Sequence, residues 1–247
     1  MKLGGYAHNN GITFFCDVLK VKTTKVKEDI QYEVDWILPK RWLRKLEGKF
    51  ILGGILVGYY QWRIMNIKYK ILMTLLIALI LLEEIFHLPL FEGVSTLPIN
   101  QKWFYGMMVL TILVNIRKII RLFQHHGAEH KVINCYTKHG YVNRYLVKKA
   151  SRFNKRCGSN LGLIIIILYS ILWFFNIDSI LWFFLIFLVA VQIAKKFALT
   201  NTKWDKYINI LQWITVLEPK EEDIDLAINA FNYLLHTYEI YRKESTM

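Results

Sequence analysis

The chain has 247 residues, 54% of them hydrophobic, and a mean hydropathy of +0.27, whereas a soluble domain of this length is not normally so apolar. The formal net charge is +13, but the cations flank long apolar runs, so we interpret them as determinants of membrane topology and expect no nucleic-acid partner. Three cysteines without a C-x-x-C pair argue against a zinc ribbon or a thioredoxin-type site and favour reduced, cytosol-facing thiols.

Residues 1–35 predict a small cytosolic β-subdomain. Val, Thr and Phe alternate with other residues in 11–15 and 20–27, and this period of two is typical of short strands. The first 40 residues contain no apolar signal-peptide region, so we expect the first membrane span to act as its own insertion signal.

Residues 36–69 predict an amphipathic, interfacial segment. Trp and Tyr are mixed here with Arg and Lys, and the apolar run 50–59 has roughly half the length that a membrane span needs. We therefore expect a helix that lies in the lipid interface or re-enters it, rather than a full span.

Residues 70–199 predict a membrane domain, because their apolar runs are long enough to cross a bilayer. Glu83 and Glu84 lie in the second half of the first run; they either form a functional acidic pair at mid-membrane or lie at the far interface, which the nearby Pro89 favours. The expected fold is mainly α and polytopic, with four transmembrane helices at residues 71–91, 103–122, 160–176 and 179–195, the last two joined by a tight turn at 176–179.

The cations predict the orientation of these spans. Lys and Arg concentrate in residues 1–70, 117–157 and 195–247. Positive-inside logic then places both termini and a histidine loop, residues 123–157, in the cytosol.

Residues 200–247 predict two cytosolic helices. Residues 201–217 are amphipathic, Glu218-Pro219 ends the pattern, and acidic residues at 221–223 begin a last helix, as the helix dipole favours. Both helices are expected to pack on one another, on the β-subdomain or on the membrane surface. The apolar stripe of the last helix comprises Ile224, Ala227, Ile228, Phe231, Leu234, Leu235 and Tyr238.

The candidate site is the pattern H-x-x-E-H formed by His126, Glu129 and His130. On a helix the two histidines share a face one turn apart, so both imidazoles can reach one metal ion. Inverted zincin metalloproteases use the same spacing, with the glutamate as general base. A catalytic zinc-type site needs a third protein ligand, which the spacing leaves open among Cys157, Cys135, His125 and His139, while Asn134 and Gln124 are candidate hydrogen-bonding partners of the ligands.

A second interpretation treats these histidines as interfacial polar groups, with Glu129 neutralising Lys131 or Arg121. Gly127, which costs about 1 kcal/mol relative to alanine within a helix, indicates a helix break or a close backbone approach. Further along the chain, Cys157 follows two cations, which predicts a lowered pKa and a thiolate suited to metal binding or nucleophilic attack; otherwise it is an inert thiol beside topology anchors.

These residues resemble the bacterial YqhQ family of integral membrane proteins of unknown function, catalogued as predicted metal-dependent enzymes. The resemblance covers residues from about 115 to the C-terminus and implies a divalent metal site in a multi-pass protein of the bacterial inner membrane. The chain departs from the family pattern at three positions: the pattern has an acidic residue where Thr137 stands, histidine where Asn154 stands and a basic residue where Leu217 stands. The matching segments are 123–131, 134–136, 151–152, 155–159 and 218–219 with the acidic stretch that follows, together with Gly4-Gly5.

Two functional hypotheses follow. In the first, the protein is a metal-dependent hydrolase, with zinc held by His126, His130 and Cys157 and Glu129 as the catalytic base, acting on a membrane peptide or a lipid head group. In the second, it is a non-catalytic membrane scaffold with a degenerate metal site that docks a protein partner at its cytosolic face. A transporter, with Glu83 and Glu84 along its path, is a weaker third alternative.

Overall fold

The computed structural model describes residues 3–27, 29–38, 52–86, 101–177, 179–200 and 205–244, together with residues 43, 45, 46, 49 and 203. The chain divides into two compact units. The sheet unit comprises Met1–Lys40, Ile116–Leu163 and Lys196–Met247, and the helical unit comprises Arg41–Asn115 and Ile164–Lys195. Every site discussed below lies within the sheet unit.

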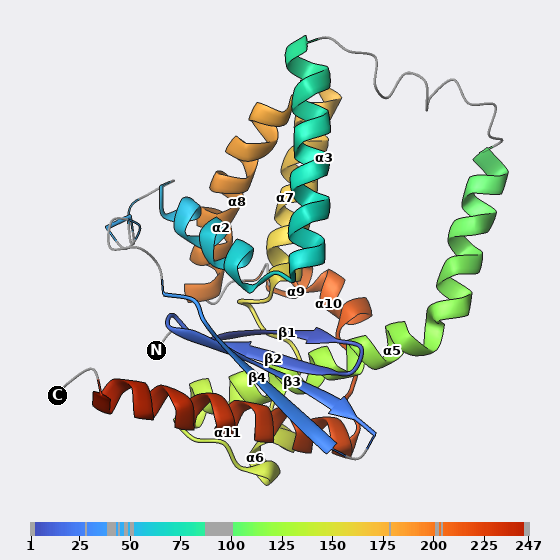
Figure 1. Ribbon diagram of the computed structural model, residues 1–247. Helices are drawn as coiled ribbons and strands as arrows, with labels where there is room; N and C mark the ends of the chain where they lie inside the picture. Colours follow the sequence, from blue (N-terminus) through green and yellow to red (C-terminus); the bar gives the residue numbers. More distant parts are fainter. Residues whose placement is uncertain are drawn as a thin grey trace. The chain divides into compact units, whose positions relative to one another are not determined.

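Four antiparallel strands form an N-terminal sheet in the order of the sequence, as the alternating pattern predicts (Figure 1). A two-residue turn, Asn9-Asn10, joins β1 to β2, and Lys27, with φ of 57°, lies after β3. The strands are β1 (Gly4–His8), β2 (Gly11–Phe15), β3 (Leu19–Val26) and β4 (Asp29–Trp36).

The last helix, α11 (Glu221–Glu244), packs on β2 and β3 of this sheet. Phe14 and Phe231 meet edge to face with ring centroids 5.3 Å apart, and both side chains are fully buried. Tyr32 stacks on Tyr233 at 4.5 Å. Much of the apolar stripe predicted for this helix is therefore buried in the core of the sheet unit, with Ile224, Ala227 and Leu234 among its members.

The helix that carries the histidines is α5 (Gln101–His139), 39 residues long. It does not end where the second span was predicted to end, at residue 122, so residues 123–139 are helical rather than a loop. Its last third shares the core with the sheet and α11 through buried Ala128, Val132 and Cys135. Two short helices precede α11: α9 (Asp205–Ile208) and α10 (Ile210–Thr215). A third, α6 (Arg144–Lys149), follows α5 and is capped by Asn143, whose Oδ1 accepts from the Tyr145 N–H.

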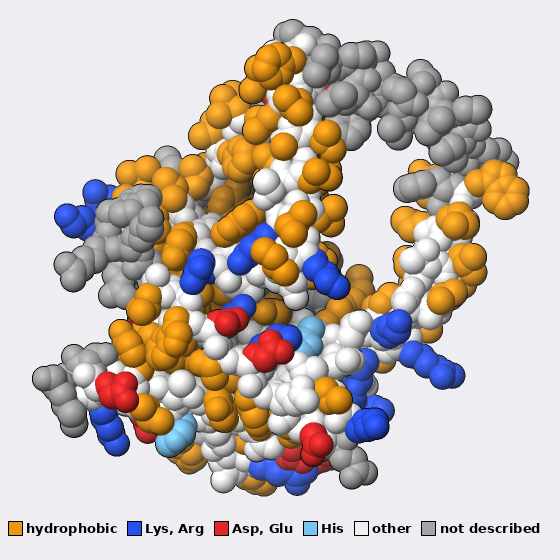
Figure 2. Space-filling model, in the orientation of Figure 1, with side chains coloured by type: hydrophobic (Ala, Val, Ile, Leu, Met, Phe, Trp, Pro, Cys, Tyr) orange, Lys and Arg blue, Asp and Glu red, His pale blue; other side chains and the backbone are white. Residues whose placement is uncertain are grey.

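The helical unit contains α2 (Gly53–Ile64), α3 (Ile67–Phe86), the first part of α5, and most of α7 (Gly158–Phe174) and α8 (Ile180–Leu199). Large hydrophobic side chains are exposed along these helices and appear in orange in Figure 2. Within this unit Ser179 Oγ donates to Glu84 Oε1 at 2.6 Å. Residues 87–100, which include the end of the first predicted span, lie outside the described part of the chain.

The prediction of four transmembrane helices is wrong. Among the described residues, a single helical stretch, Leu181–Leu199, is long and apolar enough to cross a membrane. In α3 the uncharged stretch is confined between Lys70 and Glu83. Helix α7 has 17 residues, fewer than the about 20 that are needed to cross a bilayer. Outside Leu181–Leu199, charged residues within the helices and the helix ends divide the apolar sequence of the described residues into runs shorter than a full span.

Candidate metal centre

One turn of α5 brings three polar side chains of the predicted site together. His126, Glu129 and His130 lie on adjacent positions of the helix surface because α-helical residues three and four apart are neighbours. The two imidazole rings are 4.5 Å apart, centroid to centroid, at an interplanar angle of 64°. His130 and Glu129 are buried, whereas His126 retains 21% side-chain exposure, so the cluster is reached from the His126 side.

Backbone carbonyls from two other segments orient the imidazoles. His126 Nδ1 lies 3.0 Å from the carbonyl oxygen of Thr215, at the end of α10. His130 Nδ1 lies 2.6 Å from the carbonyl oxygen of Arg152. Because a carbonyl can only accept, each ring carries its proton on Nδ1 and leaves the Nε2 lone pair free, the arrangement found in metal-binding histidines.

The third member of the cluster is Cys157. Its Sγ is 3.4 Å from His126 Nε2, and the candidate ligand atoms of His126, His130 and Cys157 all lie within 4.8 Å of one another. Tetrahedral zinc, with Zn–N near 2.0 Å and Zn–S near 2.3 Å, separates a nitrogen and a sulfur ligand by about 3.5 Å. Of the four residues left open as a third ligand, the structure therefore places Cys157 with the histidine pair.

Burial sets the protonation of these groups. It lowers the pKa of His126, and it lowers the pKa of His130 to about 3 with a further contribution from the neighbouring His126. Both imidazoles are consequently neutral near pH 7 and able to donate a lone pair. The expected lowering of the Cys157 pKa is wrong, since burial raises it and outweighs the hydrogen bonds to Ser159. The cations next to Cys157 in the sequence do not offset that loss of solvation.

Glu129 is a buried carboxyl, and no Lys or Arg among the described residues pairs with it. Its Oε2 lies 3.7 Å from His126 Nε2 and 4.0 Å from His130 Nε2, and this oxygen has no hydrogen-bond partner in the part of the chain that the structure describes. Burial raises its pKa to about 8. The two cations considered as partners bind elsewhere: Lys131 pairs with Glu218 at 2.6 Å, and Arg121 pairs with the acidic start of α11.

The other candidate ligands lie apart from this cluster. His125 points the opposite way, with Nδ1 2.8 Å from the carbonyl oxygen of His8 and Nε2 3.3 Å from Asp223 Oδ1. Cys135 is buried in the apolar core, and its Sγ lies 3.6 Å from the carbonyl oxygen of Tyr141. His139 is exposed at the end of α5.

Asn134 acts through the backbone rather than on the cluster itself. Its Nδ2 donates to the carbonyl oxygens of Ser151 and Phe153, at 2.7 and 2.9 Å. These two residues flank Arg152, whose carbonyl orients His130. Asn134 therefore holds the segment that fixes the ring of a candidate ligand.

A buried amide network fixes the segment that leads to Cys157. The Gln212 side chain accepts from the Asn154 N–H at 2.9 Å and donates to the Asn154 carbonyl at 2.8 Å. It also donates to Asn160 Oδ1 at 2.7 Å. The Asn154 side chain accepts from the Arg156 N–H, so at this departure from the family pattern the residue shapes the turn before Cys157.

Two glycines allow backbone segments to approach the site closely. A Cβ on Gly5 of β1 would lie 2.7 Å from Glu129 Cγ and 2.8 Å from Glu129 Oε1. Gly127 lies against the segment that follows α10, so the close approach is observed and the helix is not broken. Sequence reasoning missed Gly5, Thr215 and Arg152 as parts of the site. Gly4-Gly5 was a signal for the first, but a backbone carbonyl has no residue signature.

The fold and the cluster define a mainly helical protein with an antiparallel N-terminal sheet and a His–His–Cys group beside a buried glutamate. The chain belongs to the family described as "Protein of unknown function (DUF1385)", whose model matches residues 64–237. It is 36% identical over 134 residues to the "Uncharacterized protein YqhQ" of Bacillus subtilis (strain 168). That alignment covers 47% of this chain and 41% of the relative, less than half of its length. No solved structure matches the chain. The resemblance to the YqhQ family is confirmed, whereas the membrane and metal properties that it implies stay predictions.

Proposed function

We propose that this protein is a metal-dependent hydrolase in which His126, His130 and Cys157 hold a divalent ion of the zinc type. The convergence of these three side chains, from α5 and from the segment before α7, carries the proposal. Two imidazoles and one thiolate are a donor set that zinc prefers among divalent ions. Three protein ligands, rather than four, are characteristic of catalytic zinc sites.

The residues present fit such an ion. Each Nε2 atom carries a lone pair because Nδ1 of each ring is bound to a carbonyl, and the rings are neutral near pH 7. The unpartnered Oε2 of Glu129, buried beside the same two Nε2 atoms, is a polar atom for which the described residues offer no hydrogen-bond partner. When bound, the metal would supply a Lewis acid that activates water or polarises a carbonyl group.

Glu129 is the candidate general base. Its carboxyl lies beside the ligand atoms, none of the described Lys and Arg residues holds it, and its pKa near 8 matches proton transfer close to neutral pH. The exposed apolar helices favour a substrate presented at a lipid surface, either a membrane peptide or a lipid head group. We place the protein at the bacterial inner membrane, attached through α8, with its site on the cytosolic side.

Hydrolysis of p-nitrophenyl acetate by the purified chain tests this proposal. The zinc-loaded parent should release nitrophenol, and Glu129→Gln should lower kcat about 100-fold or more while the zinc content stays at one per chain, because general bases contribute 10²–10⁴-fold. Lys138→Ala, on the same helix but away from the cluster, serves as the control. Equal hydrolysis by the parent and Glu129→Gln would refute the role of Glu129, and zinc lost from Glu129→Gln would make that residue a ligand instead of a base.

A further inference from the structure

The short helix α10 has its polar and apolar sides reversed for a helix in water. Gln212, which bonds the backbone of Asn154, is fully buried. On the outer side, Ile210, Trp213 and Ile214 are 53%, 61% and 66% exposed. Their spacing of three and four residues places these side chains on one face of the helix. A surface helix normally turns its polar side outward, so this arrangement indicates apolar surroundings on the outer side.

Aromatic side chains with cations beside them extend this surface beyond α10. Phe153 lies against Trp213, with ring centroids 5.0 Å apart, and Tyr207 of α9 is 54% exposed. The Arg152 guanidinium lies over the Phe153 ring, 5.1 Å from its centroid. Lys206 Nζ lies in the same way over Tyr207, at 4.7 Å. Trp and Tyr next to Lys and Arg are typical of the boundary between lipid and water, where the rings lie at head-group level and the cations reach the phosphates.

The charge around α10 favours an anionic surface as its partner. Residues 151–160 and 196–217 each contain three Lys or Arg residues, and together they contain one acidic residue, Asp205, which pairs with Lys155. The cations are spread along both segments, which suits a surface that carries many phosphate groups.

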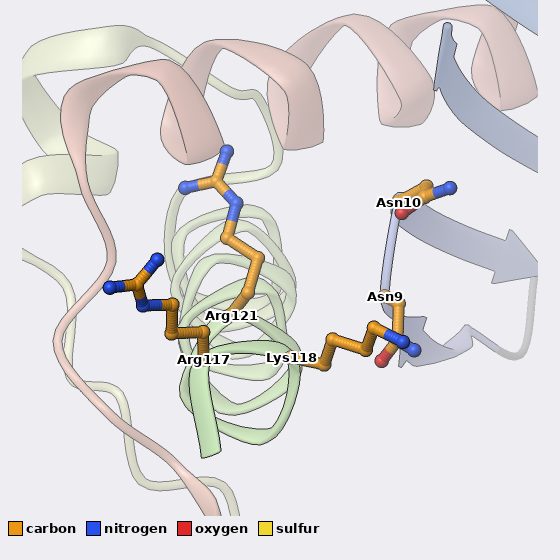
Figure 3. A pocket seen from close by; sticks show the side chains of 5 residues that line it. All are labelled: Asn9, Asn10, Arg117, Lys118 and Arg121. Carbon is orange, nitrogen blue, oxygen red and sulfur yellow. The ribbon is translucent and has the colours of Figure 1, made fainter. Parts of the chain in front are cut away.

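The cations of α5 in the sheet unit are spread in the same way. Figure 3 shows Arg117 and Lys118 extending to opposite sides of the helix, and Arg121 toward α11, where it pairs with Asp223. These three side chains therefore do not enclose a single phosphate. They directly follow the exposed Ile116, and such a change from apolar to cationic residues along a helix is typical of a membrane boundary.

The chain reaches α9 and α10 from the helical stretch that is long and apolar enough to cross a membrane. That stretch, Leu181–Leu199, ends six positions before Asp205, where α9 begins. Six residues span at most about 22 Å, so α9 and α10 lie near its end. Directly after it, the carbonyl oxygen of Thr200 accepts from Lys155 Nζ at 3.0 Å, which ties this end to the segment before Cys157.

We propose that the α10 face, formed by Tyr207, Ile210, Trp213 and Ile214, docks on the surface of a bilayer that contains anionic lipid. The inference rests on the proposed attachment through α8, and on neither metal binding nor hydrolysis. Thr215 directly follows this face, and its carbonyl binds His126, the partly exposed member of the metal centre. Docking therefore places the opening of the metal centre at the level of the lipid head groups.

Fluorescence quenching on the full chain, in vesicles of phosphatidylcholine and phosphatidylglycerol, tests this docking. The fluorophore NBD is attached to Ile214→Cys in a Cys157→Ser background, since Cys16 and Cys135 are buried. Lipid with a nitroxide on the upper acyl chain should quench it by about half or more, because an interfacial helix lies about 5–10 Å into the membrane boundary. NBD on Ile240→Cys, an exposed isoleucine near the end of α11, is the matched control and should be quenched little. Adding Trp213→Asp to the Ile214→Cys chain should abolish the quenching.

NBD on Val189→Cys, in the middle of α8, separates docking from the attachment through α8. Quenching at position 214 supports docking. Quenching at position 189 alone overturns docking while the attachment stands, and quenching at neither position overturns both. A blue-shifted but unquenched fluorophore at position 214 would mean that protein covers this face, which also overturns docking.

The lipid composition tests the role of the cations. Omitting phosphatidylglycerol should weaken the quenching at position 214 and leave that at position 189 unchanged, whereas equal quenching at position 214 would overturn the preference for anionic lipid. None of these results depends on zinc content or ester hydrolysis, so docking and the metal centre stand or fall separately.

Discussion

The carbonyl oxygen of Leu217 lies in the space that a side chain on Gly127 would occupy, 1.9 Å from the position of a Cβ atom there. The Leu217 N–H in turn donates to the carbonyl oxygen of Phe123 at 3.0 Å. The segment after α10 is thereby held against the turn of α5 that carries His126 and Glu129. This contact is between backbones, so little can yield when it is disturbed.

Gly127→Ala should therefore destabilise the protein by about 1–3 kcal/mol, the usual cost of overpacking, despite alanine's better helix propensity. Gly162→Ala is the matched control, because it is also helical and has open space around it. That control should be stabilising by up to about 1 kcal/mol. Urea unfolding of both variants provides the comparison, and two changes of the same sign would contradict the contact.

Gly5→Ala should displace Glu129, since the new methyl group would overlap the Glu129 side chain. We expect hydrolysis of p-nitrophenyl acetate to fall about ten-fold or more, while zinc content is retained, because misplacing a catalytic group by about 1 Å is costly. Gly4→Ala, whose Cβ would meet the Phe15 ring instead, controls for strain in the same strand. A Gly5→Ala variant as active as Gly4→Ala would show that the strand does not position Glu129.

Gln212→Ala should loosen the segment that carries Cys157. It removes the partner of the buried Asn154 N–H and the 2.8 Å donor to the Asn154 carbonyl, which is left with Asn160 Nδ2 at 3.4 Å, and a buried group left without a hydrogen bond costs about 1–3 kcal/mol. Zinc affinity should fall with stability, because Arg152 and Cys157 belong to the same segment. Urea unfolding and competition with a chromophoric chelator measure the two effects. The exposed Gln31→Ala on β4 should leave both unchanged.

Asp223, at the start of α11, should make the stability of the fold depend on pH in the acidic range. Burial alone would raise its pKa, but the His125 side chain, the Lys220 N–H and the Arg121 guanidinium together lower it below 3.8. Because the folded-state pKa is the lower one, this carboxylate stabilises the fold above pH 3.8, and the contribution disappears as the pH falls through the folded value.

Asp223→Asn should accordingly destabilise the protein by about 1–3 kcal/mol from pH 7 down to about pH 5, and the difference from the parent should shrink below pH 4. Unfolding free energies measured across this range decide the matter. Asp225→Asn, which alters an exposed pair with Arg144, should cost less than about 1 kcal/mol at every pH. A difference for Asp223→Asn that grows on acidification would have the wrong sign.

Local sequence patterns predicted the N-terminal strands, the last helix and the histidine pair of the candidate site. The strands followed from alternation in residues 11–27, and α11 from its apolar stripe and acidic first turn. His126 and His130 were paired by helical spacing alone. These predictions succeeded because the interactions involved are close in sequence, where periodicity carries information.

The remainder depends on contacts between distant segments. Cys157 could be named only as one of four candidate ligands, because its approach to His126 is decided by the amide network around Gln212. The carbonyls of Thr215 and Arg152 orient the rings through backbone atoms, which any residue provides. The prediction of four membrane spans is wrong for a different reason. Hydropathy describes runs of sequence, whereas helix ends and charged residues such as Lys70, Glu83 and Arg117 decide how long the apolar part of each helix is.

Elemental analysis of the purified chain tests the central claim most directly. We predict close to one zinc ion per chain, reduced to trace levels in His126→Ala, His130→Ala and Cys157→Ser but retained in the exposed His139→Ala. A parent chain without stoichiometric metal after zinc supplementation, or variants of the three clustered residues that bind zinc as the parent does, would contradict the metal centre.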